Sequence, residues 1–261
     1  MKIGLYGKSS NTALRAIHDG AMQLGFDAAF CKREGFSVEG FGLVVLIGMH
    51  EKSRTVRDAY QAIGTPVLIL DSGYILRDHG YFQAGWNGLN ALPPTAPHDR
   101  AAEMGLIAQT KRKPVPDGHI LICGQKPGDA QHDIDVDAWK DATIDMLQEY
   151  TDRPHCYRPH PRVKKPDFSL SEILQGCHCM VTYNSTAAYE AIMAGVPVIC
   201  DPCAAYADVC EVDLSRVETP RFGTKAARQR LLDRVAYGQW TMDEMRSGAA
   251  LQFLLEHAGC S

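Results

Sequence analysis

The chain has 261 residues, of which 45% are hydrophobic and 22% are charged, and its formal net charge is −4 at pH 7. This composition excludes a disordered chain and fits a globular protein with one large or two small domains. Residues 1–117 carry 13 basic and 11 acidic side chains (+2), and residues 118–261 carry 14 and 20 (−6), so that neither half is a strongly basic platform for nucleic acid.

Neither a leader nor a membrane span is apparent. Met1–Tyr6 holds only a short apolar run before Gly7, and no apolar run approaches the roughly 20 residues of a membrane span. Nine cysteines, an odd number, fit reduced thiols better than a disulfide framework. We therefore expect a soluble, cytoplasmic protein without a membrane partner, and nothing in the sequence indicates an oligomeric state.

The N-terminal half begins as a Rossmann-like domain does. The pattern predicts a strand over residues 2–6 and an amphipathic helix from Thr12 to about Leu24. The loop between them contains Gly7-Lys-Ser but lacks the spacing of a P-loop, so we expect an ordinary tight turn. Buried parallel strands are expected at 43–47 and 66–70, with a helix at 53–63.

Asp71 follows the second of these strands. A carboxylate at the carboxyl end of a strand is well placed to act as a general base, although Asp is also a common turn former. Residues 77–92 are rich in glycine and aromatic side chains and are predicted to be irregular. Such a loop could stack an acceptor on aromatic faces or could simply be packed by its own side chains. The acceptor-binding candidates are Tyr74, Arg77, His79, Tyr81 and Trp86.

A domain boundary is predicted in the proline-rich stretch that ends in Lys111-Arg-Lys113. The first domain is then expected at 1–113 and the second at 114–240, with the helical segment 241–261 crossing back. The second domain restarts with a strand at 119–123, the turn Gly124-Gln-Lys-Pro-Gly-Asp129 and a helix at 138–149. Two helices, at about 224–237 and 241–257, close the chain, and the second begins with the capping box Thr241-Met-Asp-Glu244.

Residues 179–202 read as one βαβ unit. A strand at 180–182 leads into the turn Asn184-Ser-Thr186, a helix at 187–194, a stop at Gly195 and a strand at 196–200. A helix that begins at the carboxyl edge of a sheet favours an anion, here at Ser185 and Thr186. Glu190, one turn further on, could accept hydrogen bonds from sugar hydroxyls, which points to a nucleotide or nucleotide-sugar. Ordinary helix capping explains the same residues without a ligand.

A second motif precedes this unit, Tyr157-Arg-Pro-His-Pro-Arg162. The prolines on both sides hold His160 on a stiff backbone, and an imidazole fixed in this way can stabilise the negative charge of a departing nucleotide. Arg158 and Arg162 add positive charge. A zinc site among the nearby cysteines is disfavoured, because Cys179 and Cys200 fall inside predicted buried strands.

Together, the His-Pro segment and the stretch from Ser185 through Glu190-Ala to Gly195-Val-Pro-Val resemble the donor-binding half of GT-B-type glycosyltransferases. The similarity is greatest to the capsular polysaccharide family that includes Kdo transferases, with bacterial polysialyltransferases more distant. It covers about the C-terminal half, and the N-terminal half matches only in outline. It implies an α/β fold of two Rossmann-like domains facing a cleft, with a C-terminal helix crossing back. It also implies a metal-independent site with no cofactor besides the nucleotide-sugar co-substrate.

The resemblance further implies roles for individual residues. His160 would stabilise the leaving nucleotide, and Asp71 would deprotonate the acceptor, since Asp71-x-Gly73 is similar to the acidic residue and glycine of polysialyltransferases. These families are commonly larger, so we expect a reduced N-terminal domain. The donor-binding candidates are Gly124, Gln125, Lys126, Arg158, His160, Arg162, Asn184, Ser185, Thr186 and Glu190.

Several functions remain open at this point. The first is sugar transfer to a glycan or small molecule, and the others are a nucleotide-sugar epimerase or hydrolase and a non-catalytic binder.

The Gln239-Trp-Thr241 turn and the motifs above also look like those of bacteriophage sequences. Transfer to a 5-hydroxymethylpyrimidine base in DNA, in the host cytoplasm, is then an alternative. A flipped base could be held by the aromatic loop around Trp86 and by Lys111–Lys113, although the modest net charge argues against tight DNA binding.

Overall fold

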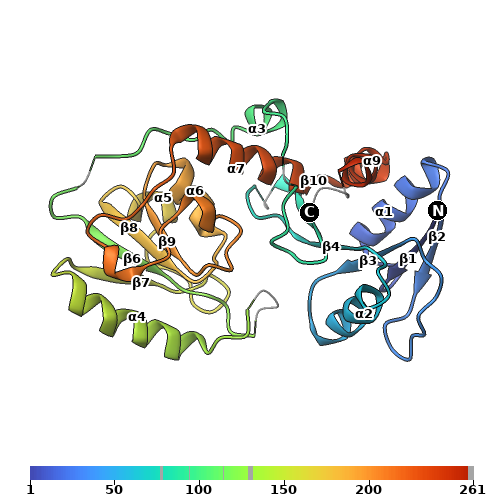
Figure 1. Cartoon of the computed structure of the whole chain (residues 1–261), viewed down its shortest axis with the longest axis horizontal. Helices are drawn as coiled ribbons and strands as arrows, with labels where there is room; N and C mark the ends of the chain where they lie inside the picture. Colours follow the sequence, from blue (N-terminus) through green and yellow to red (C-terminus); the bar gives the residue numbers. More distant parts are fainter. Residues whose placement is uncertain (77–78, 94, 114, 129–131, 258–261) are drawn as a thin grey trace. The chain divides into compact units, whose positions relative to one another are not determined.

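The computed structural model describes residues 1–76, 79–93, 95–113, 115–128 and 132–257. The chain divides into two compact units (Figure 1): the first unit is Met1–Ala96 with Arg234–Ser261, and the second unit is Pro97–Asp233. Each unit holds one open sheet with helices packed against it. The predicted α/β class with two Rossmann-like units is confirmed. Arg77, one of the acceptor-binding candidates, lies outside the described residues.

The first unit is built on a six-stranded mixed sheet of order β10-β5-β4-β3-β1-β2. Its strands are β1 (Lys2–Tyr6), β2 (Asp27–Cys31), β3 (Leu43–Ile47), β4 (Val67–Ser72), β5 (Phe82–Trp86) and β10 (Gln239–Trp240). β1 to β4 run parallel, and β5 and β10 each pair antiparallel to their neighbour. The strands of the parallel part therefore end at one edge of the sheet.

Helices cover both faces of this sheet. Alternate side chains such as Ile3 and Leu5 form one core with α1 (Thr12–Gln23), α8 (Met242–Arg246) and α9 (Ala249–Glu256). On the other face, the hydroxyl groups of Tyr6 and of Tyr60 in α2 (Glu51–Gln61) form a hydrogen bond of 2.7 Å. α8 packs so closely on α1 that a Cβ atom at Gly20 would lie 2.1 Å from the Met245 carbonyl oxygen.

Two predictions for the first unit are wrong. The stretch predicted to be irregular contains strand β5, which pairs antiparallel with β4. Only glycine fits at position 85, because a Cβ atom there would lie 2.2 Å from the Gly88 carbonyl oxygen. The single helix predicted at 241–257 is two helices, since Gly248 has φ +86° and interrupts it between α8 and α9. The predicted capping box at Thr241 is confirmed.

The second unit is built on a parallel sheet of order β7-β6-β8-β9. Its strands are β6 (His119–Cys123), β7 (His155–Arg158), β8 (Cys177–Thr182) and β9 (Val198–Cys200). α4 (Val136–Tyr150) packs its Trp139, Ile144 and Leu147 side chains on one face. α5 (Leu170–Ile173) and α6 (Ala187–Met193) lie on the other face (Figure 1). The described part of this unit also holds α3 (Asp99–Glu103), most of α7 (Lys225–Gly238) and two short 3-10 helices at Ala207–Val209 and Leu214–Arg216.

The boundary between the units differs from the predicted position after residue 113. Residues 97–113 group with the second unit because their backbone binds the end of α6: Gln109 N–H donates to the Met193 carbonyl and Arg112 N–H to that of Gly195, both at 2.9 Å. The Arg112 guanidinium donates to the carbonyls of Ala194 and Leu174 at 2.9 and 2.7 Å. These hydrogen bonds join residues 97–113 to the second unit, although the prolines in this stretch suggested a boundary at its end. At the other end, the division falls inside α7.

In the stretches of chain that the structure describes, no helix is both long enough and apolar enough to cross a membrane.

Candidate functional site

The carboxyl ends of three of the four parallel strands bring the donor-binding candidates of the second unit to one edge of its sheet. β6 ends at Cys123, β7 at Arg158 and β8 at Thr182. Gly124, Gln125 and Lys126 therefore follow β6, Pro159 and His160 follow β7, and Asn184, Ser185 and Thr186 follow β8. In parallel α/β sheets this edge is where ligands bind.

Gln125 fastens two of these turns together. It is buried (6% exposed) and its amide lies 3.1 Å from the Thr182 hydroxyl, which in turn donates to the Cys123 carbonyl at 2.9 Å. With its oxygen facing the turn after β8, it accepts the backbone N–H groups of Asn184 and Ser185 at 3.1 and 3.0 Å. Gln125 thus satisfies the N–H group of Ser185, one of the two residues at which an anion was predicted.

The start of α6 is also largely satisfied by protein groups. Ser185 Oγ accepts the N–H of Ala187 at 3.3 Å, and its carbonyl accepts the Tyr206 hydroxyl at 2.9 Å. Thr186 is the N-cap residue but makes no side-chain cap, and Asn184 is buried. The anion predicted at this helix start therefore needs a stronger anchor elsewhere on the edge.

Arg158, at the end of β7, provides that anchor. Its Nε atom is buried and has no hydrogen-bond partner among the residues that the structure describes. A buried donor without an acceptor is costly, by about 1–3 kcal/mol, so a ligand oxygen would stabilise this N–H. The guanidinium also has a hydrogen bond to the Cys123 side chain.

The Cys123 thiol lies at the end of β6, among the donor-binding candidates. Burial raises the pKa of this thiol, while the nearby Arg158 guanidinium and Ser185 hydroxyl oppose the rise and Glu190 adds to it. Arg158, Ser185 and Glu190 thus all influence one thiol at the end of β6. Glu190 is exposed on α6.

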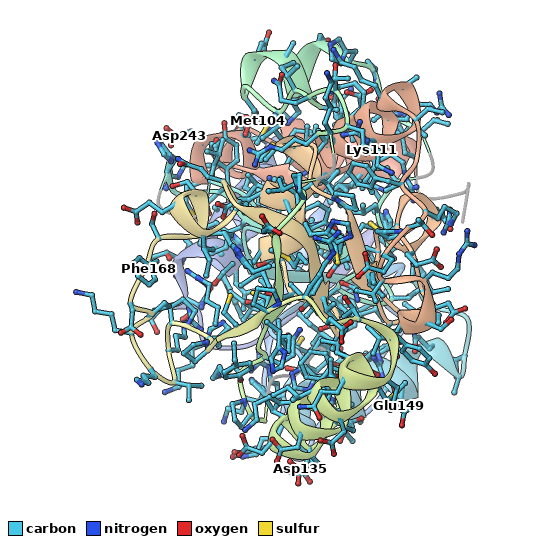
Figure 2. The ribbon with its side chains drawn as sticks, turned by 90° about the vertical axis from the view of Figure 1, so that its left-hand side faces the viewer. Met104, Lys111, Asp135, Glu149, Phe168 and Asp243 are labelled. Atoms are coloured by element: carbon cyan, nitrogen blue, oxygen red, sulfur yellow. The ribbon has the colours of Figure 1, made fainter. Side chains whose placement is uncertain are left out.

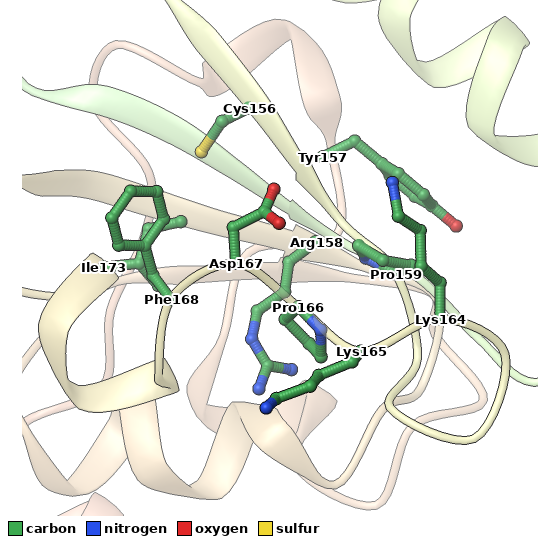
Figure 3. Close-up of a pocket in the computed structure, with 10 residues that line it drawn as sticks. All are labelled: Cys156, Tyr157, Arg158, Pro159, Lys164, Lys165, Pro166, Asp167, Phe168 and Ile173. Carbon is green, nitrogen blue, oxygen red and sulfur yellow. The ribbon is translucent and has the colours of Figure 1, made fainter.

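A pocket of about 280 Å³ opens beside Arg158, between β7 and the loop that leads to α5 (Figure 3). The side-chain ends of Arg158 and Lys165 both turn toward one side of it, whereas Phe168 and Ile173 lie at the opposite end. Lys164 and Asp167 complete the charged lining. Three cations against one carboxylate favour an anion, and the exposed Phe168 ring, labelled in Figure 2, offers an apolar surface.

His160 is held by the turn that follows β7. Its Nδ1 atom accepts the N–H of Arg162 at 3.1 Å, and its carbonyl accepts those of Val163 and Lys164 at 2.8 and 3.1 Å. Since Nδ1 accepts, the neutral ring carries its proton on Nε2 and can donate it. Arg162 itself is exposed.

Gly124 has a packing role at this edge. A Cβ atom there would lie 2.2 Å from the Tyr157 hydroxyl oxygen, so only glycine leaves room for the tyrosine ring. Burial raises the pKa of Tyr157, and the Lys140 ammonium lies 5.6 Å from its ring centre. Lys126 is half-buried in the turn after β6.

The acceptor-side candidates belong to the first unit, and most of them serve its packing. Trp86 lies in β5 within the core, and the buried Tyr74 donates its hydroxyl to the Leu89 carbonyl and to Asn90 Oδ1. These two rings are therefore not an exposed stacking surface. His79 is exposed and Tyr81 is half-buried. Asp71 lies in β4, one residue before its end, and accepts the Ser72 N–H at 2.7 Å.

Sequence reasoning missed the lysines of the pocket. Lys164 and Lys165 follow the His-Pro motif directly, and this dense run of cations was the signal that could have identified them.

Cys179 and Cys200 lie in β8 and β9 and are buried, as predicted. Tyr183 also lies at this edge. Its burial is the main cause that raises its pKa to about 12, and the neighbouring Cys203 and Asp201 add to the rise, so the phenol stays protonated.

Comparison with known proteins supports the fold. No protein-family model matches the chain, and no curated protein matches it. Among solved structures, the beta Kdo 2,4 transferase of Thermosulfurimonas dismutans KpsC matches with a TM-score of 0.53 and 16% identity, covering 90% of this chain and 89% of that one. The beta Kdo 2,7 transferase of the same KpsC matches with a TM-score of 0.50 and 15% identity, covering 90% of each chain. The chain therefore has a fold similar to that of two Kdo transferases, as the resemblance of its C-terminal half predicted.

Proposed function

We propose that this protein is a glycosyltransferase that binds a nucleotide-sugar in its second unit and transfers the sugar to a hydroxyl acceptor. The observation that carries the proposal is the buried Nε–H of Arg158, which lacks an acceptor among the described residues and lies beside a cationic pocket. A phosphate oxygen of the donor would complete it, and charged hydrogen bonds of this kind are among the strongest in proteins. The fold shared with Kdo transferases agrees with this function.

The chemistry assigns one task to each residue. The acceptor oxygen attacks the anomeric carbon as its proton passes to the Asp71 carboxylate. The bond between that carbon and the phosphate oxygen breaks, and its electron pair leaves with the nucleotide. Arg158 and the Nε2–H of His160 stabilise the charge that develops on this phosphate. Glu190 and the turn after β8 are proposed to hold the sugar or nucleoside.

The proposed acceptor is a glycan or a small molecule. Transfer to DNA is the less favoured alternative, because Arg112, one of the three cations considered for DNA, already donates to the carbonyls of Leu174 and Ala194. Trp86, which was considered as a stacking group, is buried.

The test is incubation of the full chain with UDP, GDP, CMP and TDP sugars, followed by chromatography of the released nucleotide. Parallel reactions contain oligosaccharides, small hydroxyl acceptors or hydroxymethylpyrimidine DNA. A transferase releases nucleotide and adds sugar mass to one acceptor. Release without any acceptor would indicate a hydrolase, and binding without release would indicate a non-catalytic binder. Absence of both binding and release for every donor would end the proposal.

A further inference from the structure

A second pocket lies in the first unit, at the carboxyl ends of β1 and β2. Its volume is about 700 Å³, within the roughly 300–1,000 Å³ of small-molecule sites. The loop Gly7–Ser10 and the segment Phe30–Glu34 line it, together with Lys52 of α2. The residues assigned above to donor and acceptor do not include any of these.

Arg33 is the best-anchored side chain of this pocket. Its Nε donates to the Tyr6 carbonyl and its Nη2 to the Ile47 carbonyl, both at 3.0 Å, and its Nη1 donates to Nε2 of His50 at 2.7 Å. Burial and the neighbouring guanidinium lower the pKa of His50, so the ring stays neutral and accepts. A guanidinium has five N–H groups; three are used here and two remain.

Arg33 is half-buried, and it has no acidic partner among the residues that the structure describes. All three of its acceptors are neutral, and burial, with no opposing carboxylate, lowers the pKa of its guanidinium. Taking a charge out of water without a counter-ion is unfavourable, and an anionic ligand would supply that counter-ion.

The surroundings of Arg33 are also cationic. Lys8 and Lys32 line the pocket, are exposed and form no ion pair among the described residues. Lys52 pairs with Glu34, the one carboxylate of the lining. Gly7 lets the loop pack against α1, since a Cβ atom there would lie 2.5 Å from Leu14 Cδ1. The pocket thus has four cations and one carboxylate, and Arg33 is held in place by three hydrogen bonds.

We propose that this pocket binds the anionic group of a small molecule, a carboxylate or a phosphate, with Arg33 as the counter-ion and Lys8 and Lys32 as further contacts. The site goes beyond the proposed transferase function, because it uses none of the donor-binding residues and requires no nucleotide-sugar.

The experiment follows the Arg33 Nε–H resonance of the ¹⁵N-labelled full chain, identified by its loss in Arg33→Met. Inorganic phosphate and glucuronate are the two anionic probes, and glucose is the uncharged control. We expect a saturable shift of this resonance with at least one anion and no shift with glucose. The affinity for that anion, obtained from the titration, should be at least tenfold weaker in the double variant Lys8→Met/Lys32→Met. The relative affinities of the two probes decide between phosphate and carboxylate.

Two control variants separate this site from general charge effects and from the donor site. Arg246→Met removes an exposed arginine of the same unit that does not line the pocket, and it should leave the shift unchanged. Arg158→Met should also leave it unchanged, so that this inference and the donor assignment can fail independently. No shift with either anion at tens of millimolar, or an unaltered affinity in the double lysine variant, would overturn the proposal.

Discussion

The Nδ1 atom of His160 accepts the backbone N–H of Arg162 at 3.1 Å. This contact fixes both the direction of the ring and its tautomer, because an accepting Nδ1 leaves the proton on Nε2. The neighbouring prolines stiffen the same segment. The donor site proposed for the second unit therefore has one imidazole N–H set in place before a ligand binds.

His160→Ala should lower turnover by about 10²- to 10³-fold, the usual effect of losing one charge-stabilising donor. Steady-state kinetics with the best donor of the panel measures the effect. His155→Ala, at the exposed start of the same strand, is the matched control and should retain activity. Wild-type turnover in a folded His160→Ala protein would contradict the role.

Arg158→Met keeps the length of the side chain but removes the partnerless Nε–H. We expect nucleotide affinity to fall by roughly 10- to 150-fold, which corresponds to about 1.5–3 kcal/mol for a charged hydrogen bond. Calorimetric titration with the nucleoside diphosphate or monophosphate measures it. Arg230→Met, an exposed position of α7 in the second unit, should bind normally. Equal affinity for the two variants would remove Arg158 from the donor site.

Asp71→Asn retains the shape of the side chain and its contact with the Ser72 N–H while removing the base. Donor affinity should stay the same, and transfer should fall by about 10²-fold or more. Asp58→Asn, on the exposed surface of α2, serves as the control. If donor affinity fell together with transfer in Asp71→Asn, the carboxylate would belong to donor binding instead.

Gln125→Ala should destabilise the second unit, because the N–H groups of Asn184 and Ser185 would lose their acceptor. Each buried unsatisfied group costs about 1–3 kcal/mol, and urea unfolding would show the sum. Gln125→Glu keeps an acceptor oxygen and should recover part of the loss. If the alanine variant lost affinity for the donor but no stability, Gln125 would be a direct ligand contact.

Glu211 makes the stability of the second unit depend on pH. Burial alone would raise the pKa of this carboxyl, but the N–H groups of Val212, Asp213 and Arg221, at 2.9, 3.2 and 2.9 Å, and the nearby Arg216 outweigh burial and lower it. The stabilisation is therefore complete above the ordinary pKa of about 4.3 and is lost as pH falls through the lower folded value.

Unfolding in urea between pH 7 and pH 3 tests this dependence. The wild-type chain should lose stability below about pH 4.3, and Glu211→Gln should show a shallower loss there while being less stable at pH 7 by about 1–3 kcal/mol. The same slope in both proteins would show that Glu211 does not set it.

Much of the fold was predictable because local sequence and tertiary packing agree. The strands at 2–6, 43–47 and 119–123 have continuous apolar runs, and their bounds match the structure. β5 was missed because Gly85 and polar Gln83 weaken its apolar pattern, and only the sheet explains it: Gln83 is fully buried and pairs with Asp71 of β4. The break at Gly248 was missed because the helical pattern continues across it and no proline marks it.

The candidate site was predictable in its motifs but not in its contacts. The sequence identifies Arg158 and His160, since prolines and cations cluster there, yet it does not indicate which N–H groups the protein satisfies internally. Gln125 is the clearest example, because its partners lie about sixty residues away on β8 and its neighbouring turn. Arg33 was overlooked for the same reason: its contacts come from the ends of β1 and β3 and from His50 at the start of α2.

The central claim, that donor phosphates bind at Arg158, is tested most directly by a crystal structure with the nucleotide that the panel selects. A phosphate oxygen should lie about 2.7–2.9 Å from Arg158 Nε, the usual length of a charge-assisted hydrogen bond, with His160 Nε2 facing the same phosphate. A nucleotide bound elsewhere on the chain, with Arg158 Nε still lacking a partner, would contradict the account.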